Sequence, residues 1–124
     1  MAYEIPGFTF SLPAGADFFT GGAQFRFAAI NASGQAVAPT AGGLVVGVRY
    51  TKAKLNEACT IVQSGIALVE SGDATIVAGS LLGVTATGTV RVALTGDYIV
   101  GQALETSAAT GIIIAVLLGT RAKF

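Results

Sequence analysis

Short apolar runs separated by glycine fill residues 44–118. Examples are LVVGVRY, CTIVQSG, LLGVTATG and GIIIAVLLG. Each run is about five to eight residues long, which suits β-strands and is too short for helices of ordinary length. The glycines recur at intervals close to the roughly eight to twelve residues expected of a small barrel or sandwich. We therefore predict an all-β fold, either a small β-barrel or a β-sandwich.

Residues 89–95 show the clearest alternation in the chain. Side chains on a strand point to opposite faces with a period of two. One face of this segment carries Val90, Val92 and Leu94, and the other carries Thr89, Arg91 and Ala93. We expect a half-buried strand with the first set in the core and the second set in water.

The chain carries little charge for its size. Charged residues make up 11% of the 124 residues and apolar residues 52%, whereas a typical globular protein has about 25% charged residues. The length predicts a single domain with one core. A monomer of this composition would expose larger apolar patches than soluble monomers normally tolerate. We therefore predict that contacts between subunits cover part of the surface.

The charges are balanced. Seven Lys and Arg offset seven Asp and Glu, which leaves no strong field to hold nucleic acid or an anionic membrane. Residues 112–118, the longest apolar run, are far fewer than the roughly 20 residues that a spanning helix needs, so we predict a buried strand there. The first residues lack the basic start and long apolar stretch of a secretory signal, which favours a cytoplasm as the place of synthesis. We expect neither a direct nucleic-acid partner nor a membrane partner.

Residues 1–23 are rich in aromatic side chains and are broken by proline and glycine. Pro6 and Pro13 disfavour helix before them and limit strand pairing, so this segment is not expected at the centre of a sheet. We predict an extended N-terminal arm over residues 1–23 and a barrel-like body over residues 24–124. The arm either covers the base of its own core or adds a strand to, or lies across, a neighbouring protein. Its predicted contact residues are Tyr3, Ile5, Phe8, Phe10, Leu12, Phe18 and Phe19.

The body begins with a predicted hairpin. Residues 24–31 form a strand, residues 31–35 supply the turn chemistry of Asn, Ser and Gly, and residues 36–38 return. A loop at 39–43 and a strand at 44–50 follow. Residues 51–57 then make the most polar connection in the chain, with room for one helical turn. Cys59 is the one cysteine, and we expect it to be a small packed side chain.

Histidine is absent from the chain, which excludes Ser-His-Asp and Cys-His catalytic arrangements and histidine-based zinc sites. The seven carboxylates are scattered and stand mostly beside turn residues, where we expect them to cap turns. Glu70 and Asp73 come closest to a hard-cation site, but two carboxylates make a weak one. We predict no catalytic residue, no metal and no cofactor.

Several short motifs follow one another along the body. QFRF and INASGQAV come first, then Gly47 and Val48 in LVVGV, residues 65–69, the step at residues 78–80, and a closing hairpin over residues 101–118. In this order the motifs resemble the small capsid decoration, or cement, proteins of tailed bacteriophages. The resemblance covers residues 24–118 and consists of glycine and small apolar positions. The arm is not part of it.

The resemblance implies a compact, β-tulip-like domain that forms homotrimers on the outer surface of an expanded icosahedral phage head. Bound there to the major capsid protein, such trimers would stabilise the shell against the pressure of packaged DNA. The resemblance also implies a non-enzymatic virion protein made in the cytoplasm of a bacterial host. We expect the arm to contact the shell or an adjacent trimer, with Phe8, Phe10 and Leu12 as anchors.

Two other functions are compatible with the residues. One is a trimeric β enzyme or small-ligand binder with a site between subunits, in which Arg26, Arg49 and Arg91 act with Asp73 or Asp97. The other is a different assembly component, such as a tail, baseplate or bacterial shell subunit.

Overall fold

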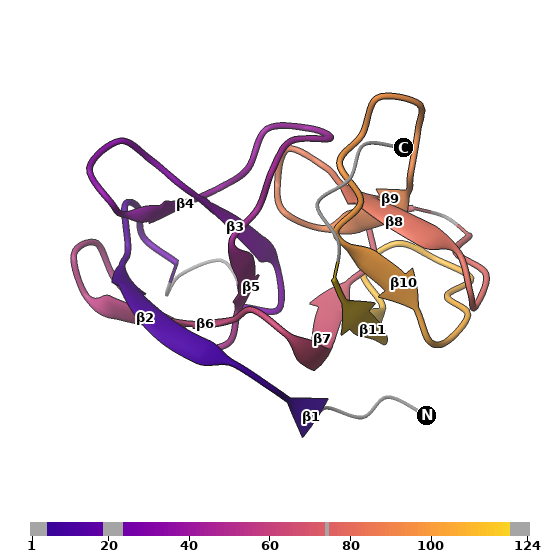
Figure 1. Cartoon of the computed structure of the whole chain (residues 1–124), viewed down its shortest axis with the longest axis horizontal. Helices are drawn as coiled ribbons and strands as arrows, with labels where there is room; N and C mark the ends of the chain where they lie inside the picture. Colours follow the sequence, from indigo (N-terminus) through magenta and orange to yellow (C-terminus); the bar gives the residue numbers. More distant parts are fainter. Residues whose placement is uncertain (1–4, 19–23, 74, 120–124) are drawn as a thin grey trace.

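The computed structural model describes residues 5–18, 24–73 and 75–119, and of Ile5 and Pro6 only the backbone. Eleven β-strands make up the regular structure of these ranges (Figure 1). They are β1 (Ile5–Pro6), β2 (Thr9–Pro13), β3 (Phe27–Ile30), β4 (Ala36–Val37), β5 (Gly47–Arg49), β6 (Ala58–Val62), β7 (Gly65–Glu70), β8 (Leu81–Val84), β9 (Val90–Val92), β10 (Gly101–Ala103) and β11 (Ile113–Leu118). The predicted all-β fold is confirmed. Across the same ranges, the chain offers no helix with the length and apolar character that a membrane crossing requires.

The strands form two antiparallel sheets. Sheet A has six strands in the order β1-β7-β11-β10-β8-β9, and sheet B has five strands in the order β2-β6-β5-β3-β4. In Figure 1 sheet B fills the left half of the molecule, and β7 to β11 of sheet A fill the right half. Residues 63–64 join β6 to β7, so the chain passes directly from sheet B into sheet A.

Sheet B curls until its two edge strands almost meet. Ala14, directly after β2, forms an isolated parallel bridge with Ala36 of β4, and the Gly15 N–H donates to the Ala36 carbonyl at 2.7 Å. The curled sheet encloses a cluster that we call the inner cluster. It consists of the buried Ala14, Phe18, Ala28, Ala36, Ala53, Cys59 and Ile61, with Phe10, Leu12 and Val46 partly buried against them. Sheet B is therefore barrel-like, and the burial predicted for Cys59 is confirmed.

A larger apolar cluster, the inter-sheet cluster, joins sheet B to sheet A. Sheet B contributes Phe27, Val48 and Val62, and most of the rest comes from sheet A and its loops. Successive residues of a strand point to opposite faces. Phe27 and Val62 accordingly face the inter-sheet cluster, while their neighbours Ala28 and Ile61 face the inner cluster. The middle of sheet B, where β3, β5 and β6 carry these residues, is thus buried on both faces, which accounts for part of the high apolar content.

Residues 89–95 depart from the expected pattern. Val90 is buried, but Val92 and Leu94 are 37% and 56% exposed, and Ala93 is buried instead. The prediction that Val90, Val92 and Leu94 share a core face is therefore wrong. β9 is an edge strand that ends at Val92. The chain then turns, with the Asp97 N–H donating to the Leu94 carbonyl at 2.9 Å, so the period of two does not continue.

Three other predicted elements match the structure. β3 and β4 form the expected hairpin, and Asn31 Oδ1 fixes its turn by accepting the N–H groups of Ser33 and Gln35 at 3.0 and 2.9 Å. β11 is the expected buried strand, between β7 and β10, although Leu117 is 44% exposed. Of the strand predicted at 44–50, only Gly47–Arg49 are in a strand, β5. Residues 51–57 form a hydrogen-bonded turn and not a helical one.

Residues 5–14, which we call the strap, run as one ladder along residues 57–66. The register is continuous from Ile5 opposite Ile66 to Pro13 opposite Ala58, and the Ala14 N–H donates to the Glu57 carbonyl. β1 is the edge of sheet A and β2 the edge of sheet B, as the prolines predicted, and neither strand is central. The boundary at residue 23 between arm and body stays a prediction, but the strap belongs to both sheets.

Candidate functional site

The strap distributes the predicted contact residues unequally. Tyr3 and Phe19 lie outside the described residues, and for Ile5 the structure gives only the pairing of its backbone with Ile66. Phe10 and Leu12 point into sheet B, where they are partly buried against the inner cluster. These two side chains already contribute to the core of their own chain.

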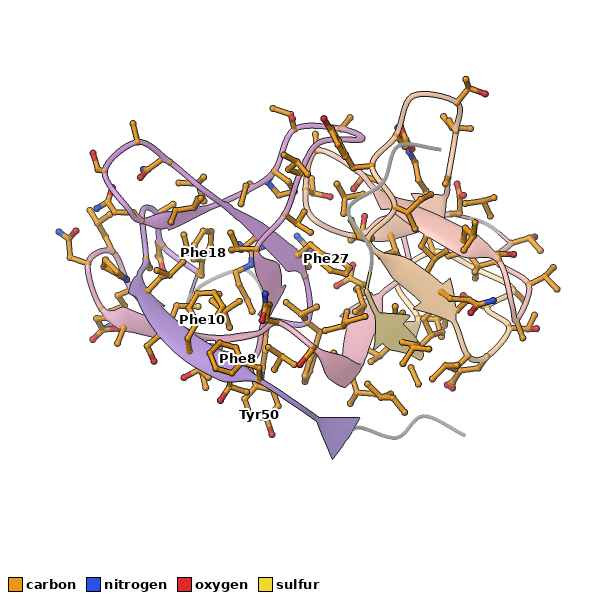
Figure 2. The ribbon with its side chains drawn as sticks, viewed as in Figure 1. Phe8, Phe10, Phe18, Phe27 and Tyr50 are labelled. Carbon is orange, nitrogen blue, oxygen red and sulfur yellow. The ribbon has the colours of Figure 1, made fainter. Side chains whose placement is uncertain are left out.

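Among the predicted contact residues whose side chains the structure describes, Phe8 is the one that is largely exposed. Its side chain is 60% exposed, the highest value among the large apolar side chains of the described residues. Figure 2 shows it beside Phe10 at β2, and the two ring centroids lie 6.1 Å apart. The Phe8 N–H donates to Ser64 Oγ at 2.8 Å, which fixes the backbone where the strap crosses between the sheets. Phe8 therefore presents an apolar ring to solvent from a backbone that this hydrogen bond holds in place.

Phe18, in contrast to Phe8, is buried. It is 5% exposed, and the guanidinium carbon of Arg49 lies 4.1 Å from its ring centroid, a cation–π contact. Arg49 is itself only 2% exposed and donates its Nε–H to the Arg26 carbonyl at 3.4 Å. Burial lowers the pKa of Arg49 to about 10, against the opposing effect of Cys59. The guanidinium is thus still charged at neutral pH and is held by the ring.

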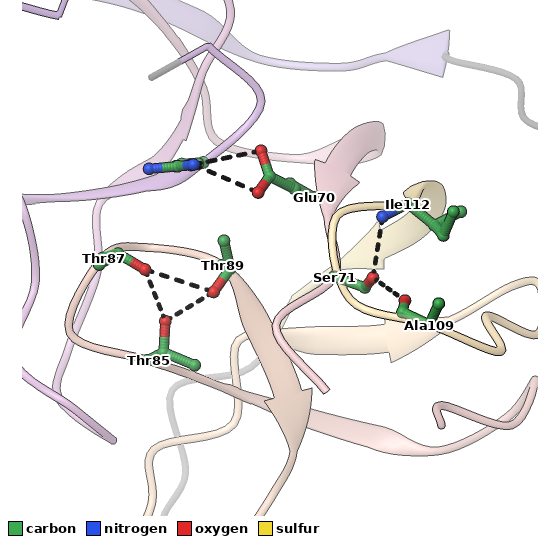
Figure 3. A network of polar contacts seen from close by, with 8 residues as sticks. Glu70, Ser71, Thr85, Thr87, Thr89, Ala109 and Ile112 are labelled. Carbon is green, nitrogen blue, oxygen red and sulfur yellow. Dashed lines mark hydrogen bonds and ion pairs between the residues drawn. The ribbon is translucent and has the colours of Figure 1, made fainter. Parts of the chain in front are cut away.

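The charged residues considered for an inter-subunit site are held in separate contacts. Arg26 pairs with Glu70 at 3.2 Å, as Figure 3 shows for the Glu70 carboxylate. Asp73 Oδ2 accepts the Val92 N–H at 2.9 Å and so caps an edge strand. Glu70 and Asp73 therefore serve different partners. In the part of the chain that the structure describes, no three His, Cys, Asp or Glu side chains gather as a metal site would require.

Asp97 is buried and forms the other ion pair. Its Oδ1 accepts a hydrogen bond from Arg91 Nη2 at 3.0 Å, and its Oδ2 accepts from Arg91 Nε at 3.2 Å and from the Leu94 N–H at 3.1 Å. Burial alone would raise the pKa of this carboxyl. The hydrogen bonds from Arg91 and Leu94, together with the charge of Arg91, outweigh burial, and the pKa is lowered.

This lowered pKa predicts a loss of stability in acid. Because the folded-state pKa lies below the unfolded value of about 3.9, the carboxylate stabilises the fold above that pH, and the contribution is lost as pH falls through the folded pKa. Denaturant titrations between pH 7 and pH 2 should show this loss in the wild type. Asp97→Asn should be less stable by about 1–3 kcal/mol at pH 7 and should show a smaller loss in acid. Equal losses in the two proteins would contradict the assignment.

Two polar networks hold loops of sheet A (Figure 3). Thr85, Thr87 and Thr89 share hydrogen bonds among their hydroxyls, at 2.7 to 3.5 Å, across the turn between β8 and β9. Ser71 Oγ donates to the Ala109 carbonyl at 2.7 Å and accepts the Ile112 N–H at 3.2 Å. The second network ties the loop before β11 to the end of β7. Both networks fix the shape of the surface around the strands.

A half-open cavity of about 260 Å³ lies between the sheets. Its walls come from five separate segments and include Phe27, Val45, Gln63, Tyr98 and Leu118. In Figure 2 Phe27 lies between the two halves of the molecule. Polar and apolar surface contribute about equally to the walls, so the cavity is not a purely apolar pocket. Sequence patterns do not predict this cavity, because the residues of its walls come together only in the folded chain.

A second apolar surface lies on the outer face of sheet A. Leu81, Gln102 and Leu117 are direct cross-strand neighbours on β8, β10 and β11, and therefore share one face. Leu81 and Leu117 are 43% and 44% exposed. Beside them, with Ile99 and Gly101 in its wall, is an apolar hollow of about 180 Å³. The predicted contact residues did not include this face.

Comparison with solved structures relates the fold to a phage protein. No protein-family model matches the chain, and no curated protein matches it. The chain is similar to the N base of head fiber gp8.5 in bacteriophage phi29, with a TM-score of 0.73. The similarity covers 94% of this chain and 97% of that chain, at 15% sequence identity. At this identity the match shows that the two chains share an all-β fold.

Proposed function

We propose that this protein is a structural, non-enzymatic component of a bacteriophage head. More specifically, it is a decoration protein that binds the major capsid protein on the outside of an expanded icosahedral head. The observation that carries the proposal is the shared fold with a head fiber base over nearly the full length of both chains. The motif resemblance of residues 24–118 to phage cement proteins, which rests on the sequence alone, points the same way.

Assembly as a homotrimer is part of the proposal. With 11% charged residues, the chain has little charge to keep its copies apart. Two exposed apolar surfaces support contacts between copies or with the shell, one at Phe8 on the strap and one at Leu81 and Leu117 on sheet A. Of the predicted contact residues, Phe8 has the most suitable exposure, whereas Phe18 is used inside its own chain.

Stabilisation of the head follows from binding equilibria. A protein that binds only the expanded shell lowers the free energy of that state by RT ln(1 + [L]/Kd) at each site. At a free concentration 100 times Kd this is about 2.7 kcal/mol per site, repeated over the lattice. The protein then acts by its binding free energy alone, without chemistry, to resist the pressure of packaged DNA.

A second candidate is a base that carries a fiber. The solved structure that this chain resembles is the N base of a head fiber, and 97% of that base is covered. A fiber base and a lattice-wide decoration protein differ in copy number. The two functions can therefore be separated on the particle itself.

The test is the copy number of this chain in purified virus particles, measured by quantitative mass spectrometry against the major shell protein. Equal copy numbers are expected for a decoration protein, and far fewer copies for a fiber base. In a companion experiment, the purified protein should sediment with expanded heads and not with unexpanded ones. Absence from the particles, or no binding to either head form, would contradict a head-bound role.

A further inference from the structure

We propose that the open edge of β2 pairs with the same edge of a second copy of the chain, antiparallel and about a two-fold axis. The pairing joins two copies of sheet B into one continuous sheet. This two-fold joint is a contact separate from the three-fold contacts of the proposed homotrimer, and it holds whether or not the protein binds a phage head.

Thr9 and Ser11 turn their backbone groups away from sheet B. The Gln63 N–H donates to the Phe8 carbonyl, and the Ala14 N–H donates to the Glu57 carbonyl, each at 2.8 Å. In an antiparallel ladder, residues that bond the partner strand alternate with residues that face the other way. The even-numbered residues of 8–14 therefore bond β6. In the described part of the chain, the N–H and C=O groups of Thr9 and Ser11 have no partner.

The open part of the edge is short and has defined ends. Pro13 occupies the next outward position and has no N–H to donate. Beyond it, the Gly15 N–H already donates to the Ala36 carbonyl of β4 at 2.7 Å, so β4 closes the edge there. At the other end, the Gly7 N–H already donates to the Ser64 carbonyl at 2.9 Å. An added strand thus finds donors only at Thr9 and Ser11, which fixes where it can pair.

The other strand edges of the molecule are protected. β1 and β4 have two residues each. On β9, the Val92 N–H is capped by Asp73 Oδ2 at 2.9 Å, and the Val90 carbonyl accepts the Gly72 N–H at 2.6 Å. Natural edge strands avoid pairing by being short, charged or covered. β2 has five residues, and residues 5–16 contain no charged side chain.

The segment that fits this edge is β2 itself. With Phe10 on the two-fold axis, Thr9 of one copy lies opposite Ser11 of the second copy, and each such pair exchanges two backbone hydrogen bonds. Phe10 then faces the second copy's Phe10, and Phe8 faces the second copy's Leu12. These are non-hydrogen-bonded pairs, in which the side chains approach most closely. The edge is therefore self-complementary, as a two-fold joint requires.

The joint covers apolar surface that one copy leaves open. Phe8 is 60% exposed, and Phe10 and Leu12 are only partly buried against the inner cluster. Apolar and aromatic cross-strand pairs stabilise such a joint. The chain has a formal net charge of zero, so two copies do not repel each other as they approach.

Mixed disulfide formation tests the register. In the proposed joint, residues 9 and 11 of opposite copies have Cα atoms about 5.5 Å apart, which a disulfide spans. Two copies of residue 9 lie about 8–9 Å apart, beyond that reach. We expect an equimolar mixture of Thr9→Cys and Ser11→Cys to form a covalent dimer on oxidation, and neither variant alone to do so. The wild type is the blank, because its single cysteine, Cys59, is buried. No mixed dimer, or equal yields from one variant alone, would overturn the proposal.

Sedimentation equilibrium of Ser11→Pro gives an independent test. Proline at this outward position keeps the β6 ladder and removes one open donor, as Pro13 does naturally. Its association constant should fall at least tenfold, while the matched Ser11→Ala variant should associate like the wild type. Circular dichroism of both variants verifies the fold. Association of Ser11→Pro at wild-type strength would overturn the proposal, and it would leave binding to phage heads untouched.

Discussion

A protein carrying Phe27→Ala should lose about 3–5 kcal/mol of its free energy of unfolding. Phe27 is 1% exposed and is the largest side chain of the inter-sheet cluster. Its backbone pairs with Val48 in sheet B, and its N–H donates to the Gly88 carbonyl in the loop between β8 and β9 at 2.8 Å. Truncation would enlarge the cavity that Phe27 already lines and weaken the joint between the sheets. Urea or guanidinium titration measures the loss.

Phe8→Ala is the matched control for this experiment. It removes the same atoms from a side chain that is 60% exposed, so its cost should stay within about 0.5 kcal/mol under conditions where the protein is monomeric. A loss below about 1 kcal/mol for Phe27→Ala would mean that the inter-sheet cluster does not hold the two sheets together.

Gly88→Ala should be comparably damaging, for a different reason. Gly88 has φ of +90°, and a Cβ atom added to it would lie 2.5 Å from the Phe27 carbonyl oxygen and 3.2 Å from Arg49 Nη2. The left-handed backbone costs about 1–3 kcal/mol for a residue with a side chain, and overpacking adds about 1–3 kcal/mol. We expect a total loss of about 3–5 kcal/mol in the free energy of unfolding.

Gly79→Ala separates the two causes. Gly79 has φ of +92°, almost the same backbone, but nothing lies within 4 Å of an added Cβ. Its cost should be the backbone part alone, about 1–2 kcal/mol. Equal costs at both positions would show that the closeness of Phe27 to Gly88 adds nothing to the cost of the substitution.

Local patterns predicted the parts of the fold that are made locally. The hairpin of β3 and β4 follows from Asn31, whose side chain accepts two N–H groups of the turn. The apolar run at 112–118 correctly predicted β11. This strand lies between β7 and β10, and a strand in that position needs apolar side chains. The prediction for residues 89–95 was wrong for a physical reason. Alternation shows which side chains share a face of a strand, but it does not show whether other residues cover that face, and β9 is an edge strand that ends at Val92.

The candidate site was predicted only in part, since the residues that contact the strap are distant from it in the sequence. The prolines correctly indicated that the first strands are edge strands. Nothing local indicates that residues 5–14 pair with residues 57–66, or that Phe18 covers the buried guanidinium of Arg49. The alternation of Phe8, Phe10 and Leu12 predicted apolar contacts. Which of these contacts lie within the chain depends on the curl of sheet B, a property of the whole sheet.

The pairing of the strap with β6 and β7 also affects the order in which the strands pair during synthesis. Thr9 pairs with Val62, about 50 residues later in the sequence. On the ribosome, this segment emerges early and has no partner until β6 and the start of β7 have followed it. Pairing over such a separation carries a large loop-closure cost, which slows folding. The strap, which emerges before its partner strands, is therefore expected to dock late, and until then its uncharged, aromatic strand stays exposed to the ribosome-bound chain and its neighbours.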